Sequence, residues 1–129
     1  MIIGTGIDIV EISRIKKASQ QWKDKFLKRI FTDKEIEYSK ERPYSYQHLA
    51  ARFAAKEAVL KAFGNGWKKS AEWTDIEIWN EESGKPKVKL YGPLKKMQQK
   101  LNVDDIIISL SHTHSYAVAS AILVKDEKV

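Results

Sequence analysis

The chain of 129 residues contains no cysteine. Disulfide bonds, thiolate metal sites and cysteine nucleophiles are therefore excluded from its structure and its chemistry. Residues 1–4 (MIIG) provide neither a basic segment nor a small-residue cleavage site, so the start of the chain does not resemble an export signal. We therefore expect a cytoplasmic protein.

Long hydrophobic runs are missing as well. The longest stretch without a formal charge runs from Ile106 to Val124, but polar residues at 109–115 (SLSHTHS) interrupt it. A transmembrane helix needs about 20 predominantly apolar residues in succession. This stretch therefore predicts a β-hairpin, and we expect no membrane partner.

Common motifs for phosphate binding and for nucleophilic catalysis are also absent. The chain has no G-x-x-x-x-G-K-[ST] loop, and Gly4-Thr5-Gly6 lacks the third glycine of a dinucleotide-binding fingerprint. It has no G-x-S-x-G nucleophile elbow either. If the protein acts on phosphate groups, other residues must bind them.

The chain does have a concentrated excess of positive charge. Its formal net charge is +6 and its isoelectric point is about 9.4. The segment from Ile12 to Phe31 holds seven basic residues and one acid, Asp24, and so accounts for the whole excess. A basic face of this kind attracts polyanions, which are either nucleic acids or acidic proteins.

Nucleic-acid binding is the weaker of these two alternatives. Proteins that bind single strands place aromatic rings among basic residues on one face. The basic segment contains only Trp22 and two phenylalanines, while Trp73 and Trp79 lie near acids. We therefore expect no nucleic acid among the partners.

Local patterns predict one α+β domain over residues 1–129, with a mainly antiparallel sheet packed on a long helix. The expected helices begin near Ile12 and then cover Asp24–Phe31, Asp33–Glu41 behind a Thr32/Glu35 capping box, Ser45–Gly66 and Pro93–Lys100. The expected strands are Met1–Val10, a hairpin around 76–78 and 88–90, Ile106–Ser111 and Tyr116–Val124. Because the first strand is apolar at both parities, it is expected to be buried on both faces.

The helix expected from Ser45 to Gly66 carries charges where an ordinary buried helix has none. Its ends have a candidate cap in Ser45 and glycine stops at Gly64 and Gly66. Its apolar stripe, which we expect to face the core, consists of Leu49, Phe53, Leu60 and Phe63. Lys56 falls inside this stripe.

Glu57 lies at the edge of the same stripe, and Lys61 follows one turn later. The simplest interpretation is an ion pair between these two residues along the helix, worth a few tenths of a kcal/mol. The alternative is a functional site, because a charge on a mostly apolar helix is costly unless it is paired or bound to a ligand.

Asp8 is the second carboxylate that needs an explanation, since it is the only charge in the first strand. It either caps the helix that follows or binds a ligand. Together Asp8 and Glu57 are hard oxygen ligands that suit Mg²⁺, and nearby lysines offset charge on a phosphoryl group. A zinc site using His112 and His114 is the weaker alternative, because a spacing of two in a turn is not diagnostic.

Three blocks of sequence resemble the signatures of the holo-acyl-carrier-protein synthases, the short, bacterial-type 4′-phosphopantetheinyl transferases. These blocks are residues 6–15 (GIDIVEISRI), residues 52–58 (RFAAKEA) with 61–64 (KAFG), and residues 109–112 (SLSH). They follow in the same order as in the family and extend over the whole chain. The resemblance implies the 4′-phosphopantetheinyl transferase fold.

The resemblance also implies a Mg²⁺-dependent reaction of fatty acid biosynthesis. In it, coenzyme A donates its 4′-phosphopantetheine group to a serine of an apo acyl carrier protein and releases adenosine 3′,5′-bisphosphate. By carry-over Asp8 and Glu57 bind Mg²⁺, and Lys61 neutralises the pyrophosphate of coenzyme A. The serine proton could pass to Glu57, Asp8 or a water on the metal.

Further roles follow from the same resemblance. Arg52 and His112 are the candidates for other phosphates of coenzyme A, and Lys85 and Pro86 for the adenine. Carrier proteins of this family are acidic, so Arg14 is the first candidate for contact with the carrier. The residues expected to steer the carrier to the enzyme are Lys16, Lys17, Lys28 and Arg29.

The family also implies a homotrimer with active sites between subunits. The apolar terminal strands would fit such a buried surface, and they would equally fit the core of a monomer. In that setting Lys56 could contact either a neighbouring subunit or a phosphate.

Overall fold

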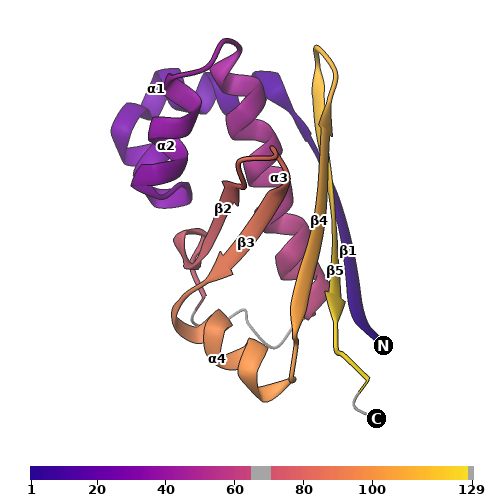
Figure 1. The fold of residues 1–129 in the computed structure, drawn as a ribbon. Coiled ribbons are helices and arrows are strands. Elements are labelled where there is room, and N and C mark those ends of the chain that lie inside the picture. Colours follow the sequence, from indigo (N-terminus) through magenta and orange to yellow (C-terminus); the bar gives the residue numbers. More distant parts are fainter. Residues whose placement is uncertain (65–70, 128–129) are drawn as a thin grey trace.

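The structure is a computed structural model that describes residues 1–64 and 71–127 (Figure 1). Its elements in chain order are β1 (Ile2–Glu11), α1 (Ile12–Ile30), α2 (Asp33–Lys40), α3 (Ser45–Phe63), η2 (Trp73–Asp75), β2 (Ile76–Asn80), β3 (Pro86–Leu90), α4 (Gly92–Lys100), β4 (Asp105–His112) and β5 (Tyr116–Val124). No helix within these described ranges is long and apolar enough to cross a membrane.

The strands form two antiparallel sheets on either side of α3. The larger sheet has the order β1-β5-β4, and β2 pairs with β3 in a separate hairpin. Figure 1 shows α3 running between the two sheets. The expected α+β class with mainly antiparallel strands on a long helix is confirmed.

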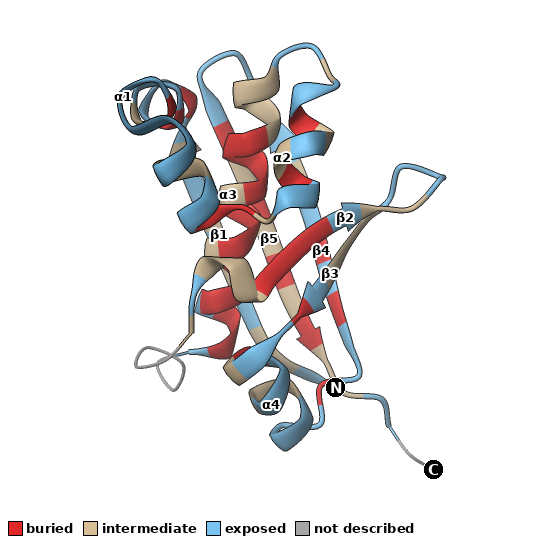
Figure 2. Cartoon of the chain, turned by 90° about the vertical axis from the view of Figure 1, so that its left-hand side faces the viewer, coloured by how far each residue is buried: buried red, intermediate tan, exposed pale blue. Residues whose placement is uncertain are grey.

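Helix α3 is buried on nearly all sides because the larger sheet, α1, α2 and β2 all pack against it. Figure 2 shows the buried residues concentrated on α3 and on the strands beside it. Ala54, Ala58 and Ala62, on the side away from the predicted apolar stripe, are also buried. Small side chains on this side allow a strand to approach the helix closely.

Two glycines of β1 make this approach possible. A Cβ atom added at Gly6 would overlap the carbonyl oxygen of Ala58, and one at Gly4 would overlap that of Ala62. The backbone of β1 therefore lies directly on the backbone of α3. This contact brings Asp8, two residues after Gly6, to the same side as the second half of α3.

The helix boundaries agree with most of the local signals. Lys23 has a left-handed φ of 48° within α1, at the break that separates the two helices expected from sequence. The capping box of Thr32 and Glu35 is present at the start of α2. Gly64, with a φ of 80°, ends α3 as predicted, whereas Gly66 lies outside the described residues.

The start of α3 differs from the expectation. The N-cap is Tyr44, in the left-handed region at φ 59°, and no side chain caps the helix there. Ser45 is the first helical residue and therefore cannot act as the cap.

The prediction that β1 is buried on both faces is wrong for the single chain. Ile3, Val10 and the glycines face α3, but Ile7 and Ile9 on the opposite face are each 65% exposed. Apolar content at both parities identifies residues that avoid water. It does not say whether the same chain provides the cover.

Candidate active site

A pocket between β1, α1 and α3 brings three of the predicted site residues together. Its volume is about 510 Å³, and Asp8, Arg14 and Glu57 line it. These side chains come from the second half of β1, the first turn of α1 and the middle of α3. The remaining walls are Ile9, Val10, Glu11, Ile15, Ala18, Phe26, Ile30, Phe53 and Tyr116.

Lys61 contacts Asp8 but does not line this pocket; it lines another hollow with Thr5, Gly6 and Ile7. Its Nζ donates hydrogen bonds to Asp8 Oδ1 at 2.9 Å and to the carbonyl oxygen of Ile7 at 3.1 Å. The observed ion pair therefore joins α3 to β1 and does not run along the helix to Glu57. Because the Lys61 side chain is 52% exposed, the pair is weakly stabilising and open to a competing anion.

These contacts rule out one of the two interpretations of Asp8. The residue preceding α1 is Glu11, and no side chain caps that helix. Asp8 uses Oδ1 for Lys61 instead and faces the pocket. Asp8 is therefore not the cap of α1, and the binding of a ligand by Asp8 stays a prediction.

Glu57 is held by Trp73, a residue that the sequence did not single out. The indole Nε1–H of Trp73 donates to Glu57 Oε1 at 2.6 Å. The ring of Trp73 also packs against Phe53, with the ring centroids 6.1 Å apart. The sequence shows only an aromatic residue shortly before β2. It does not predict that this residue binds Glu57, which lies 16 positions earlier in the chain.

Lys56 is a structural residue of the core. Its Nζ lies 2.6 Å from Glu35 Oε1, and both side chains are completely buried. The same Nζ donates to the carbonyl oxygens of Ile30 at 2.7 Å and Trp73 at 3.1 Å. Neither the subunit contact nor the phosphate contact considered for Lys56 is therefore available to it. Burial lowers its pKa, and the Glu35 carboxylate opposes that shift.

Arg52 and His112 belong to a second group of basic residues, around Tyr38. The guanidinium groups of Arg42 and Arg52 lie 3.4 and 4.0 Å from the centre of the Tyr38 ring. His48 packs edge-on against Tyr38 at 5.9 Å and against His112 at 6.2 Å. Burial and the neighbouring charges of Arg52, His112 and Arg42 lower the pKa of His48. Burial likewise lowers the pKa of Arg52.

The β2–β3 hairpin is tied to this second group. Arg52 donates to Asn80 Oδ1 at 2.6 Å, and Asn80 Nδ2 donates to the carbonyl oxygen of Gly84 at 2.9 Å. Lys85 and Pro86 follow directly in the turn and at the start of β3, and Lys85 is exposed. The predicted adenine residues thus lie in a turn linked to Arg52 through Asn80.

The donor set favours a hard divalent cation over zinc. Within the part of the chain that the structure describes, no three His, Cys, Asp or Glu residues cluster in a way that could hold a metal. His112 packs on His48, while His114 lines a different pocket. Asp8 and Glu57, two of the three acidic residues that line the pocket with Glu11, offer oxygen ligands. This donor type fits Mg²⁺, an ion that keeps several waters and takes further ligands from phosphates.

Comparison with known proteins identifies the family. The sequence profile described as the 4′-phosphopantetheinyl transferase superfamily matches residues 4–121. The chain belongs to this superfamily. Among curated relatives, a holo-[acyl-carrier-protein] synthase of Solibacter usitatus is 42% identical over 123 residues, covering 95% of this chain and 98% of the relative.

Solved structures of 4′-phosphopantetheinyl transferases share the fold. The holo-[acyl-carrier-protein] synthase of Neisseria meningitidis aligns with a TM-score of 0.88 at 30% identity, covering 97% of this chain and 100% of that one. The Helicobacter pylori enzyme, solved in complex with coenzyme A, aligns with a TM-score of 0.81 at 32% identity and covers 93% and 99% of the two chains. The family and fold expected from the sequence are confirmed.

In this transferase chain the predicted site residues form two separate groups. Arg52 and Glu57 are five positions apart on α3, a rotation of about 140°, and Lys61 lies about 180° from Arg52. Asp8 is on edge strand β1 of the larger sheet, whereas His112 is on the opposite edge strand, β4. Among the described residues, those that line the Asp8–Glu57 pocket include neither Arg52 nor His112.

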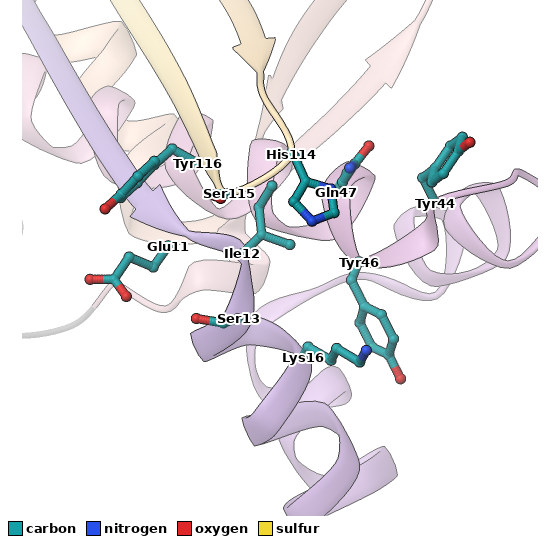
Figure 3. Close-up of a pocket in the computed structure, with 10 residues that line it drawn as sticks. All are labelled: Glu11, Ile12, Ser13, Lys16, Tyr44, Tyr46, Gln47, His114, Ser115 and Tyr116. Carbon is teal, nitrogen blue, oxygen red and sulfur yellow. The ribbon is translucent and has the colours of Figure 1, made fainter.

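The residues predicted to contact the carrier protein all lie exposed on α1. Arg14 lines the Asp8–Glu57 pocket, and Lys16 lines a neighbouring pocket of about 540 Å³ (Figure 3). Figure 3 shows Lys16 beside the ring of Tyr46, whose centroid is 5.9 Å from Nζ. Glu11 and Tyr116 line both pockets, which therefore adjoin.

The second half of α1 places its basic residues at another hollow. Lys28 and Arg29 line it together with Trp73. Lys17 is exposed on the first half of α1 and lines neither of the pockets that contain Arg14 and Lys16. The five predicted carrier contacts thus extend over much of one helix.

Proposed function

We propose that the chain transfers the 4′-phosphopantetheine group of coenzyme A to a serine of an apo acyl carrier protein and releases adenosine 3′,5′-bisphosphate. The observation that carries this proposal is the placement of Asp8 and Glu57 in one pocket with Lys61 on Asp8. Membership of the transferase superfamily supports the same reaction, as do its holo-[acyl-carrier-protein] synthase relatives, among them an enzyme solved with coenzyme A.

Each of the two carboxylates uses one oxygen to contact a side chain, and its second oxygen can bind a metal ion. Asp8 and Glu57 would therefore hold Mg²⁺. When bound, the metal ion supplies charge neutralisation for the pyrophosphate of coenzyme A. Lys61 is exposed and bound to Asp8, so it can move onto the phosphate and stabilise the charge that develops as the bond to the leaving group breaks. The proton of the serine would pass to Glu57, to Asp8 or to a water on the metal.

Arg52 and His112 are proposed to bind other phosphates of coenzyme A. Arg42 and His48 add two further basic groups around Tyr38. These two residues, which lie before α3 and in its first turn, were not identified from the sequence. Lys85 and Pro86, in the turn linked to Arg52 through Asn80, are proposed to contact the adenine.

The separation of these two groups supports a homotrimer with active sites between subunits. A neighbouring copy that brings its β4 edge to the β1 edge of the first would place His112 next to Asp8. Head-to-tail contacts of this kind close into a ring when the rotation between neighbouring copies allows it, and a homotrimer is such a ring. The exposed apolar face of the larger sheet, with Ile7, Ile9 and Ile107, would be covered in the same assembly.

The carrier protein is proposed to dock on α1. Arg14 lies in the pocket itself, where it can contact a carboxylate beside the carrier serine. Lys16, Lys17, Lys28 and Arg29 extend the positive charge along the helix and would raise the association rate. We further propose that residues 1–129 act as one domain in fatty acid biosynthesis and in the cytoplasm.

The proposed reaction can be tested by mass spectrometry. The chain is incubated with coenzyme A, Mg²⁺ and an apo acyl carrier protein, and the carrier is examined for the added mass of phosphopantetheine. We expect modification with the wild-type chain, and a loss of at least ~100-fold in rate with Asp8→Ala or Glu57→Ala. Full activity of either variant, or an unmodified carrier with the wild-type chain, would contradict the proposal.

A further inference from the structure

Trp73 is held at two points by consecutive residues of α3. Its indole Nε1–H donates to Glu57 Oε1 at 2.6 Å, and its carbonyl oxygen accepts a hydrogen bond from Lys56 Nζ at 3.1 Å. Lys56 points into the core and Glu57 lines the candidate active site. Trp73 therefore connects the core directly to a carboxylate of the site.

The core end of this connection is fully anchored. An ammonium group has three donors, and Lys56 directs them to Glu35 Oε1 and to the carbonyl oxygens of Ile30 and Trp73. Glu35 in turn accepts from the backbone N–H groups of Thr32 and Ile78. The backbone of Trp73 is thus tied to α1, α2, α3 and β2 at once.

The ring of Trp73 is also confined. Phe53, which lines the Asp8–Glu57 pocket, packs against it at 6.1 Å, and the guanidinium of Arg29 lies 6.0 Å from its centre. A ring fixed on the backbone side and confined by neighbours presents its N–H in one direction. The glutamate it meets has three side-chain torsions and would otherwise sample several rotamers.

We propose that Trp73 is a positioning residue that orients the Glu57 carboxylate for binding of Mg²⁺, with the buried Lys56–Glu35 pair as its anchor. This inference rests on the proposed function and adds to it a residue outside the group that touches substrate or metal. Donors that orient a metal-binding side chain typically change metal affinity or activity by about 10–100-fold when they are removed.

The direct test is Trp73→Phe, which keeps an aromatic ring between Phe53 and Arg29 and removes the N–H donor. We expect the Mg²⁺ concentration for half-maximal rate to rise by about 10–100-fold. The KM for the carrier protein should stay unchanged, because the basic residues of α1 remain. The matched control is Trp79→Phe, which replaces a tryptophan on the exposed face of β2.

A binding measurement gives a readout that does not depend on turnover. Mn²⁺ can replace Mg²⁺ as a probe, and its free concentration is followed by electron paramagnetic resonance in the presence of coenzyme A. Trp73→Phe should weaken Mn²⁺ binding by a similar factor, while Trp79→Phe should match the wild-type chain. A wild-type chain with no Mg²⁺-dependent transfer would instead refute the proposed function itself.

The wild-type protein provides a second readout in case Trp73→Phe does not fold. The chain has four tryptophans, and the indole resonance of Trp73 can be assigned by elimination from Trp22→Phe, Trp67→Phe and Trp79→Phe. We expect this resonance to shift when Mg²⁺ and coenzyme A are added. An unmoved Trp73 resonance, or a folded Trp73→Phe variant with wild-type Mg²⁺ dependence and Mn²⁺ affinity, would overturn the inference.

Discussion

The ammonium group of Lys56 and the carboxylate of Glu35 lie 2.6 Å apart with both side chains completely buried. Each partner is also bonded to backbone groups, so the pair acts as a junction between the helices and the β2 strand. Two buried charges of this kind are stabilising only while both are present, because an unpaired buried ion keeps its full desolvation cost.

The first prediction concerns this pair. Lys56→Met leaves Glu35 buried without its counter-ion and should lower the free energy of unfolding by about 3–5 kcal/mol. The measurement is urea unfolding of the wild-type and variant chains. Lys61→Met on the same helix is the control, since its exposed pair with Asp8 should contribute only about 0–1 kcal/mol. Equal losses in the two variants would refute the structural role of Lys56.

The sequence could locate Lys56 in an apolar stripe but could not name its partner. Glu35 lies in another helix, and its visible pattern was the capping box with Thr32, which is present. The same carboxylate also contacts Lys56 and Ile78. Local signals therefore predicted the helix start correctly, whereas the second role of Glu35 depends on which elements pack together.

The candidate active site likewise combines residues that the sequence could indicate with others that it could not. Asp8 and Glu57 were recognisable as carboxylates in apolar surroundings and through the family signatures, and the structure places both in one pocket. Trp73 was not recognisable, because an isolated tryptophan before a strand is compatible with any packing. The exposure of Ile7 and Ile9 was missed for a related reason: the pattern of a strand records that a face avoids water but not which chain covers it.

The second prediction concerns the contact between β1 and α3. Gly6→Ala adds a Cβ that overlaps the carbonyl oxygen of Ala58, so the strand must move away from the helix. Forced overpacking costs about 1–3 kcal/mol, and here Asp8 would also be displaced from Lys61. We expect a lower midpoint of thermal unfolding together with reduced transfer activity. Lys96→Ala, at an exposed position of α4, is the control and should leave stability nearly unchanged.

The third prediction concerns pH. The pKa of His48 is lowered from its ordinary 6.5 by burial and by Arg52, His112 and Arg42. Just below pH 6.5 the unfolded chain therefore binds a proton that the folded chain does not, so stability falls as pH decreases through this range. His48→Gln removes this contribution, and its free energy of unfolding should depend less on pH between 7 and 5 than that of the wild type.

Adenosine 3′,5′-bisphosphate provides a check on the same histidine. If the basic group around Tyr38 binds a phosphate, the added negative charge favours protonated His48 and should reduce the pH dependence of wild-type stability. Denaturant unfolding at several pH values, with and without this nucleotide, measures the effect. Identical pH profiles for the wild type and His48→Gln would contradict the predicted shift.

The fourth prediction tests whether the active site takes its two groups of residues from different subunits. Asp8→Ala removes a carboxylate of one group, and the double variant Lys85→Ala/His112→Ala removes two exposed members of the other. Each variant alone should have little transfer activity. If a site combines Asp8 of one subunit with Lys85 and His112 of its neighbour, subunits of the two variants refolded together will form some intact sites.

A head-to-tail interface uses different patches of its two subunits. When the two variants mix randomly in equal amounts, about a quarter of the interfaces therefore combine an unmodified Asp8 with an unmodified Lys85 and His112. The mixture should therefore reach about a quarter of wild-type activity, well above the mean of the two separate variants. Mixing without refolding is the control and should give no gain as long as the assembled oligomers keep their subunits. If the refolded mixture is only as active as the mean of the separate variants, both groups act within one subunit. The separation of Asp8 from His112 across the β1-β5-β4 sheet would then need a different explanation.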